Sequence, residues 1–174
     1  MEPANPYFSR YFGAGFVFTD NQLILCGWEP GKQQPGLYGI GGKAEPADGG
    51  DYRITAARET LEELFTIQPT RPLLLRVAAL RPVREEFISG YVMIYNSFTT
   101  LQQIIRLVRE PSPFYPRNPI TIEELLFKRF TNGKAEVAQL CLLPVTRLPV
   151  LVSTDLADDI RRLSKQRSPI ENGQ

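Results

Sequence analysis

The residues best placed to do chemistry are three glutamates in one short segment, "RETLEEL" (58–64). Glu59, Glu62 and Glu63 are spaced i, i+3 and i+4, so a helix would place their carboxylates on one face. Carboxylates packed together repel one another, and a divalent cation relieves that repulsion. Arg58 can brace Glu62 from one helical turn away. The alternative interpretation of the same run is the solvated face of a surface helix.

A glycine pair and a lysine precede this segment, at the end of "GLYGIGGK" (36–43). Gly41 and Gly42 would let the backbone approach a metal or a phosphate closely, and Lys43 adds a positive charge. The glycine pair taken alone is explained equally well by a plain turn. The ordered string of glycines, lysine and glutamates predicts an oxygen-only metal site that faces a diphosphate.

The chain contains no histidine and two cysteines, Cys26 and Cys141. Without histidine, catalytic triads and histidine-ligated zinc are excluded, and two cysteines are too few for a thiolate zinc site. Metal chemistry must therefore rest on carboxylates, which favours Mg²⁺ or Mn²⁺. Both cysteines lie in apolar runs, so we expect buried, reduced thiols.

Length and composition indicate one soluble globular domain, since the chain has 174 residues, 43% of them hydrophobic. The formal net charge of +1 gives no overall attraction to nucleic acid or membrane, although a local basic groove stays possible. We find no signal-peptide pattern and no apolar run of about 18–20 residues, so a cytoplasmic protein is expected. We expect the domain over 1–166 and a flexible tail over 167–174.

Residue patterns predict the elements that position these groups. Apolar residues recur at spacings of three and four from Ile54 to Leu64, which predicts a helix over 52–65 with Asp51 as its N-cap. The expected strands are a hairpin over 13–28 with its turn at "TDNQ", a strand over 36–42, two strands over 72–82 and 87–98 separated by an exposed turn at 84–86, and a strand over 135–145. The other expected helices lie over 100–110, 122–128 and 153–165, and the last is capped by Ser153 or Thr154. An extended loop is expected over 111–119 and a turn at Asn132 and Gly133. This mixture predicts an α/β or α+β sandwich.

The segment over 42–66 resembles the Nudix box, whose pattern is G-x5-E-x7-R-E-U-x-E-E-x-G-U with U a bulky apolar residue. Gly42 matches the opening glycine, and the "REUxEE" part is matched at identical spacing by Arg58, Glu59, Glu62 and Glu63. The sequence departs from the pattern at several positions. Asp48 stands where the first glutamate is expected, with a loop two residues longer before Arg58, while Thr60 replaces a bulky apolar residue and Phe65 replaces the box glycine.

The resemblance implies an α/β/α sandwich with a mixed central sheet. It also implies a hydrolase that uses Mg²⁺ or Mn²⁺ to cleave the diphosphate of a nucleoside diphosphate linked to another moiety, such as a dNTP, a dinucleotide or a nucleotide sugar. Carried over by position, metal would be bound by Glu59, Glu62, Glu63 and the Gly41 carbonyl. Arg58 would orient the glutamates.

The general base is not fixed by the resemblance, because related enzymes place it differently. Glu59 is one candidate, and Glu136, near the start of the expected last strand, is another. The alternative for Glu136 is an ordinary residue at a strand edge. For Glu85 and Glu86 we favour a surface role at a hairpin tip.

Aromatic and arginine side chains suit a nucleobase or a sugar. The candidates are Arg10, in the N-terminal segment beside the first strand, and Trp28 and Tyr38, which flank the loop leading to the predicted site, with Gly42 and Lys43 for the phosphates. Further aromatic candidates in the N-terminal segment are Tyr7, Phe8, Tyr11 and Phe12. Each of these aromatics can also be an ordinary core or rim residue.

A helical insertion or lid is expected over 98–130, and its cations are Arg106, Arg109, Arg117, Lys128 and Arg129. These cations suit capped RNA, as in the similar Nudix decapping enzymes of large DNA viruses that release m7GDP, or they belong to a solvated helix with salt bridges. A third hypothesis is a catalytically silent Nudix-fold module that binds nucleotide. A monomer or a homodimer is expected, with no membrane partner.

Overall fold

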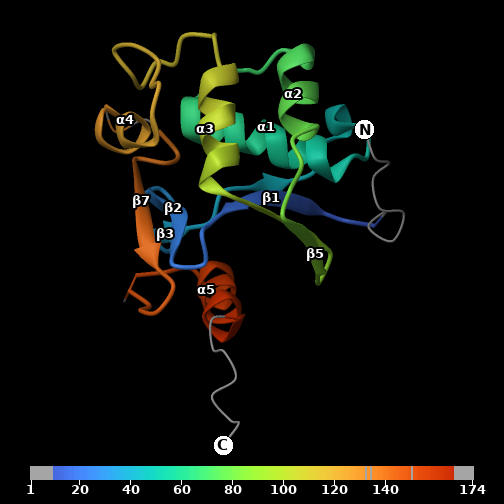
Figure 1. Cartoon of the computed structure of the whole chain (residues 1–174), viewed down its shortest axis with the longest axis vertical. Helices are drawn as coiled ribbons and strands as arrows, with labels where there is room; N and C mark the ends of the chain where they lie inside the picture. Colours follow the sequence, from blue (N-terminus) through green and yellow to red (C-terminus); the bar gives the residue numbers. More distant parts are fainter. Residues whose placement is uncertain (1–9, 132, 134, 150, 167–174) are drawn as a thin grey trace, which may run out of the picture.

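Two small β-sheets form the middle layer of the computed structural model, which describes residues 10–131, 133, 135–149 and 151–166 (Figure 1). The first sheet has the order β4 (Gly42–Lys43), β1 (Gly13–Phe18), β6 (Tyr91–Asn96) and β5 (Arg84–Ile88). It is mixed, because β1 and β6 run parallel while the other neighbours are antiparallel. The second sheet is antiparallel, with the order β3 (Gly36–Tyr38), β2 (Leu23–Glu29) and β7 (Gln139–Pro144).

Helices lie on both sides of this layer (Figure 1). On one side are α1 (Tyr52–Phe65), α2 (Arg71–Ala78), α3 (Phe98–Leu107) and α4 (Ile122–Phe127). On the other side is α5 (Thr154–Gln166). A short 3-10 helix, η2 (Pro46–Asp48), precedes α1. The chain is therefore an α/β/α sandwich with a mixed sheet, and the predicted fold class is confirmed.

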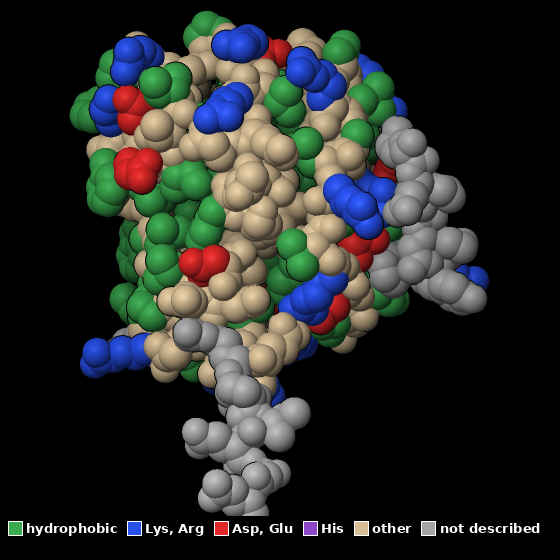
Figure 2. Space-filling model, in the orientation of Figure 1, with side chains coloured by type: hydrophobic (Ala, Val, Ile, Leu, Met, Phe, Trp, Pro, Cys, Tyr) green, Lys and Arg blue, Asp and Glu red, His purple; other side chains and the backbone are tan. Residues whose placement is uncertain are grey.

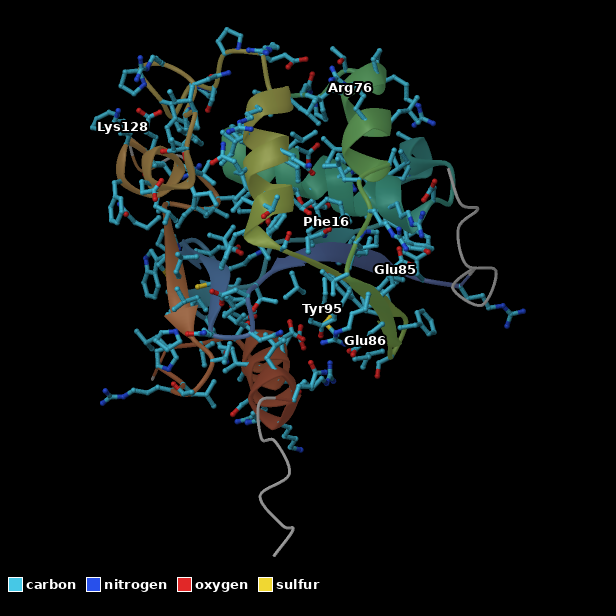
Figure 3. All side chains as sticks on the ribbon, viewed as in Figure 1. Phe16, Arg76, Glu85, Glu86, Tyr95 and Lys128 are labelled. Atoms are coloured by element: carbon cyan, nitrogen blue, oxygen red, sulfur yellow. The ribbon has the colours of Figure 1, made fainter. Side chains whose placement is uncertain are left out.

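Alternation along the strands produces the two interfaces of the sandwich. In β1, Phe16 and Phe18 pack in the cluster that includes α1 and α3, whereas Val17 packs in the cluster that includes α5. In β6, Ile94 belongs to the first cluster and Tyr95 to the second. Phe16 and Tyr95 accordingly lie on opposite sides of the sheet (Figure 3).

The expected hairpin over 13–28 is wrong, although both of its strands form. β1 and β2 are joined by a single bridge between Thr19 and Ile24. β1 pairs instead with β6 in parallel, and β2 pairs with β7 from Leu23 to Trp28. Both strands are buried on both faces, so partners distant in sequence outcompete the neighbour across the turn.

The expected strand over 72–82 is also wrong, because residues 71–78 form α2. Leu73 and Val77 are buried one helical turn apart, and the apolar run resembles a strand only in composition. The expected turn at 84–86 is strand β5, and the chain turns at Ser89 and Gly90, where φ is 51° and 85°. Positive φ at both positions is typical of a tight hairpin turn.

The helix predicted over 52–65 is confirmed at both ends, and Asp51 is its N-cap because its side chain accepts from the Arg53 N–H. Helices also form over 98–107, 122–127 and 154–166, close to their predicted ranges, and the last is capped by Ser153, which accepts from the Leu156 N–H. No helix or strand interrupts 111–119, as expected. Asn132 and the tail over 167–174 lie outside the described residues.

The segment over 98–130 contributes to the main core. The buried side chains that it adds to the cluster around α1 are Leu101, Ile104, Ile105, Tyr115 and Leu125. Cys26 and Cys141 face each other across β2 and β7 as free thiols, with their Sγ atoms 3.2 Å apart. Along the part of the chain that the structure describes, no helix combines the length and the apolar character needed to cross a bilayer.

Candidate active site

The loop that contains Gly41 and Gly42, here called the glycine loop, packs against the glutamates of α1. Gly41 has φ 144°, and a Cβ there would lie 2.5 Å from the Gly15 Cα, so this position requires glycine. Its N–H donates to the Glu63 Oε2 over 3.0 Å. A Cβ on Gly42 would lie 2.5 Å from the Glu59 carboxyl carbon. The two glycines therefore bring the backbone within reach of two carboxylates.

Arg58 ties this loop to the helix. Its Nε and Nη2 atoms donate to the two Asp48 carboxylate oxygens over 2.9 and 3.1 Å, and Nη2 also donates to the Lys43 carbonyl over 2.8 Å. Its Nη1 atom donates to Glu59 over 2.8 Å and to Glu62 over 3.1 Å. The predicted bracing of Glu62 is present, and hydrogen bonding to Asp48 raises the pKa of Arg58 above its ordinary value.

Asp48 is the buried partner of Arg58, and the longer loop does not displace it. Its carboxylate also accepts from the Thr55 hydroxyl over 2.7 Å and from the Glu45 N–H over 2.9 Å. Burial acts to raise the pKa of Asp48, but the bonds from Arg58, Glu45 and Thr55 outweigh it and hold the pKa below its usual value. An ionised Asp48 fixes the arginine that in turn holds the glutamates.

The end of α1 is held by Arg129, one of the cations for which the sequence analysis offered either capped RNA or a solvated helix with salt bridges. Phe65, in place of the box glycine, is buried in the core, and Thr66 takes the left-handed conformation with φ 52°. Arg129 donates to the carbonyls of Glu63 and Leu64 over 2.9 and 2.7 Å. These are two of the carbonyls that a helix leaves without partners at its C-terminus.

Arg129 is therefore neither available to bind RNA nor part of a solvated helix face, so both expectations for this residue are wrong. The side chain is buried, and it also donates to the Val137 carbonyl over 2.8 Å and lies near the rings of Phe114 and Tyr115. In the sequence it looks like one more cation in a basic stretch, and no local pattern identifies its carbonyl partners.

Burial shapes the electrostatics of the three glutamates. It raises the pKa of Glu59, Glu62 and Glu63, and it does so most strongly for Glu63. The charges of Glu29 and Glu136 further raise the pKa of Glu63, while the Gly41 N–H lowers it. The charge of Glu62 also raises the pKa of Glu59, and that of Glu59 raises the pKa of Glu63, so the mutual repulsion inferred from the spacing is present.

Glu29 is a functional candidate that the sequence analysis missed. It is 3% exposed at the end of β2, and its Oε2 atom lies 3.1 Å from the Lys32 Nζ. The same Nζ lies 3.0 Å from the Glu136 carboxylate, whose side chain is 64% exposed. Lys32 therefore joins a buried and an exposed glutamate beside Glu63. A glutamate within the apolar run "LILCGWE" was the available signal.

The donor set fits a hard divalent cation in its chemistry. Among the described residues, no three histidine, cysteine, aspartate or glutamate side chains converge closely enough to hold a metal ion. The carboxylates of Glu59 and Glu63 nevertheless lie against Gly42 and Gly41, and burial makes their negative charges unfavourable. Oxygen ligands with unfavourable buried charge are what Mg²⁺ or Mn²⁺ would stabilise.

A cavity of about 390 Å³ opens beside this site, between the sheets and α5. Glu29 and Gly41 line it, and so does Tyr38, one of the predicted substrate-binding residues. Arg10 and Trp28 are not among the described residues that line it. Gly42 and Lys43 lie on β4 instead, where the Lys43 side chain is exposed.

The other cations of the 98–129 segment are on the surface. Lys and Arg side chains gather at the end of the molecule away from α5, and Lys128 points outward from α4 (Figures 2 and 3). Arg117 and Lys128 both pair with Glu124, whereas Arg106 and Arg109 are exposed. Glu85 and Glu86 also have partners, since Glu85 accepts from Tyr52 and Arg53 and Glu86 pairs with Arg84.

No protein-family model matches the chain, and no curated protein does. Two solved structures with which it aligns are the NUDIX domain of Shewanella oneidensis NrtR complexed with ADP ribose and a NUDIX-family hydrolase from Clostridium perfringens. The first is 14% identical, with a TM-score of 0.40, and the alignment covers 91% of this chain and 89% of that one. The second is 10% identical, with a TM-score of 0.39, covering 91% and 99%.

Proposed function

We propose that this chain is a Nudix-type hydrolase of one domain over 1–166, which cleaves the diphosphate of a nucleoside diphosphate linked to another moiety. The observation that carries the proposal is the glycine loop locked against the buried glutamates of α1. Arg58 holds the loop and the helix together by donating hydrogen bonds to Asp48, the Lys43 carbonyl, Glu59 and Glu62. The match of these residues to the Nudix box supports the same conclusion.

Glu59, Glu62 and Glu63, with the Gly41 carbonyl, would hold Mg²⁺ or Mn²⁺. When bound, the ion would neutralise the diphosphate and lower the pKa of the attacking water. Arg58 orients Glu59 and Glu62 through the bonds described above.

A carboxylate must accept the proton of the attacking water. Glu59 is one candidate, because it lies beside the glycine loop and burial raises its pKa. Glu136 is the other, because it is exposed and its charge acts on both Glu59 and Glu63. The pair Glu59→Gln and Glu136→Gln, assayed across pH, separates them, because loss of the base removes the acid limb of the rate profile.

The test is hydrolysis of a substrate panel with Mg²⁺ or Mn²⁺, comprising dNTPs, ADP-ribose, dinucleoside polyphosphates, cap dinucleotide and capped RNA. Glu63→Gln should lose at least about 100-fold in rate. Glu123→Gln, at an exposed position of α4, is the matched control and should keep full activity. Wild type and Glu63→Gln that are equally inert on the whole panel, yet bind nucleotide, would indicate a silent binding module instead.

Capped RNA is the second candidate substrate, because exposed arginines of α2 and α3 gather at one end of the molecule (Figure 2). Arg71 and Arg76 contribute from α2, and Arg106 from α3. Affinity for RNA through these residues should fall steeply with salt. Efficient cleavage of free nucleotides, together with activity on capped RNA that depends neither on RNA length nor on salt, would exclude this candidate.

A further inference from the structure

The cavity beside α5 continues from the proposed diphosphate site, because Gly41 belongs to both and Glu29, which lines the cavity, acts through its charge on Glu63. A substrate whose diphosphate lies at the glycine loop therefore has this cavity as the enclosed space next to it. Its volume of about 390 Å³ is within the range of small-molecule pockets, about 300–1,000 Å³.

The charges that line the cavity disfavour another phosphate. Its carboxylates are Glu29, Asp155, Asp158 and Asp159, and its described cations are Lys32 and Arg162. Both cations already face carboxylates, since Lys32 bridges Glu29 and Glu136, and Arg162 Nη1 lies 3.6 Å from the Asp159 carboxylate. An excess of acceptor oxygens suits a group that donates hydrogen bonds and carries no negative charge.

Aromatic rings supply the flat surface that a nucleobase needs. Phe12 and Tyr91 line the cavity together, with ring centroids 6.0 Å apart and planes inclined by 58°. Tyr38 lines it as well. Stacking on aromatic side chains is the common way in which proteins hold a base. Rings together with carboxylates suit a base with N–H groups on its edge.

Asp159 is the most enclosed of the three aspartates that α5 contributes to the cavity. Its side chain is 13% exposed, against 47% for the neighbouring Asp158, which pairs with Arg161. The charged and titratable groups acting on Asp159 are Asp155, Asp158 and Arg162 from α5, Arg84 from β5, and Tyr91 and Tyr95 from β6. The Arg84 guanidinium stacks over the Tyr95 ring at 3.6 Å and pairs with Glu86, so its charge is shared.

We propose that this cavity binds the nucleobase of the substrate and that Asp159 selects a guanine-type edge. Guanine presents two adjacent N–H donors, and the two oxygens of one ionised carboxylate accept both. Adenine and cytosine present a donor beside an acceptor on the corresponding edge, so one carboxylate oxygen would face a lone pair. The inference rests on the proposed function only in placing the diphosphate at Gly41.

Burial raises the pKa of Asp159 to about 7, so its carboxylate is ionised above that pH. The experiment is calorimetric binding of GDP, ADP, CDP and UDP to the full chain in EDTA at about pH 8. GDP should bind about tenfold more tightly than the other three. Asp159→Asn should lower the affinity for GDP about tenfold and leave that for ADP within about twofold. Glu123→Gln removes one negative charge from an exposed position of α4, outside the cavity, and should keep the preference for guanine. Circular dichroism checks that both variants fold.

Equal affinities for the four diphosphates, or no binding at millimolar concentration, would overturn the inference. So would an Asp159→Asn variant that weakens all four equally. Because no metal is present, these results do not depend on turnover. Selectivity for guanine without hydrolysis of any substrate would overturn the proposed function alone, and hydrolysis without selectivity for a base would overturn this inference alone.

Discussion

Two buried arginines hold the two ends of the glutamate run, and they do so in opposite ways. Arg58 is 7% exposed and Arg129 is 9% exposed. Arg58 binds carboxylate side chains from its own loop and helix. Arg129 binds backbone carbonyls of α1 from a segment far along the chain. One arginine sets the positions of the acidic side chains, and the other completes the helix that carries them.

The difference shows which contacts can be recognised in a sequence. Arg58 and Asp48 are ten positions apart, and their charges are visible in the residue types. Arg129 and Glu63 are 66 positions apart, and the acceptor is a carbonyl that every residue has. The sequence therefore does not distinguish an arginine that binds backbone carbonyls from one that binds a phosphate.

The largest effect is expected from Arg58→Ala. Removing the guanidinium leaves Asp48 as a buried, unpaired carboxylate, which costs about 3–5 kcal/mol of unfolding free energy. Urea denaturation of the metal-free protein measures it. The double variant Asp48→Ala, Arg58→Ala should recover part of the loss, since the orphaned charge is gone. Strictly additive losses would show that the two residues do not act as a pair.

Arg129→Ala should cost somewhat less, about 2–4 kcal/mol, because neutral carbonyls rather than a charge lose their partner. The same denaturation series measures it. Arg117→Ala is the matched control, since its exposed pair with Glu124 should be worth less than about 1 kcal/mol. If the two variants were equally stable, the capping role of Arg129 would have to be abandoned.

The smallest effect concerns Glu63, whose carbonyl Arg129 holds and whose carboxylate accepts from Gly41. Burial raises the pKa of this carboxyl well above its ordinary value. A carboxyl whose pKa is raised by folding contributes stability at pH values below its pKa in the unfolded state. That contribution is lost as the pH rises through its pKa in the folded state. Metal-free Glu63→Gln should therefore melt a few degrees above wild type at about pH 8, with a smaller gap at about pH 5.

Addition of Mg²⁺ should reverse this order, because only the native carboxylate gains from the cation. Thermal melting with and without EDTA measures both parts. A wild type that is the more stable protein at alkaline pH without metal would contradict the burial of an ionised Glu63.

The sequence predicts α1 and its glutamates well because their pattern is local. Apolar spacing and Asp51 define the helix, and Gly41 to Lys43 lead into it. It predicts strand pairing poorly, because β1 and β6 pair across more than 70 positions and the short apolar run of α2 has a composition that fits either element. The sequence does not predict Glu29, Lys32 and Asp159 as site residues for the same reason, since only the folded sheets bring them to one cavity.

The carbonyl contacts of Arg129 also bear on how the molecule opens. Because the arginine joins the last turn of α1 to the Val137 carbonyl just before β7, that turn cannot fray while the rest of the fold stays intact. Amide protons there should exchange with solvent only when the whole domain unfolds. A nascent chain that ends before residue 129 lacks this clamp, so the acidic helix is completed late, once the second sheet is assembled.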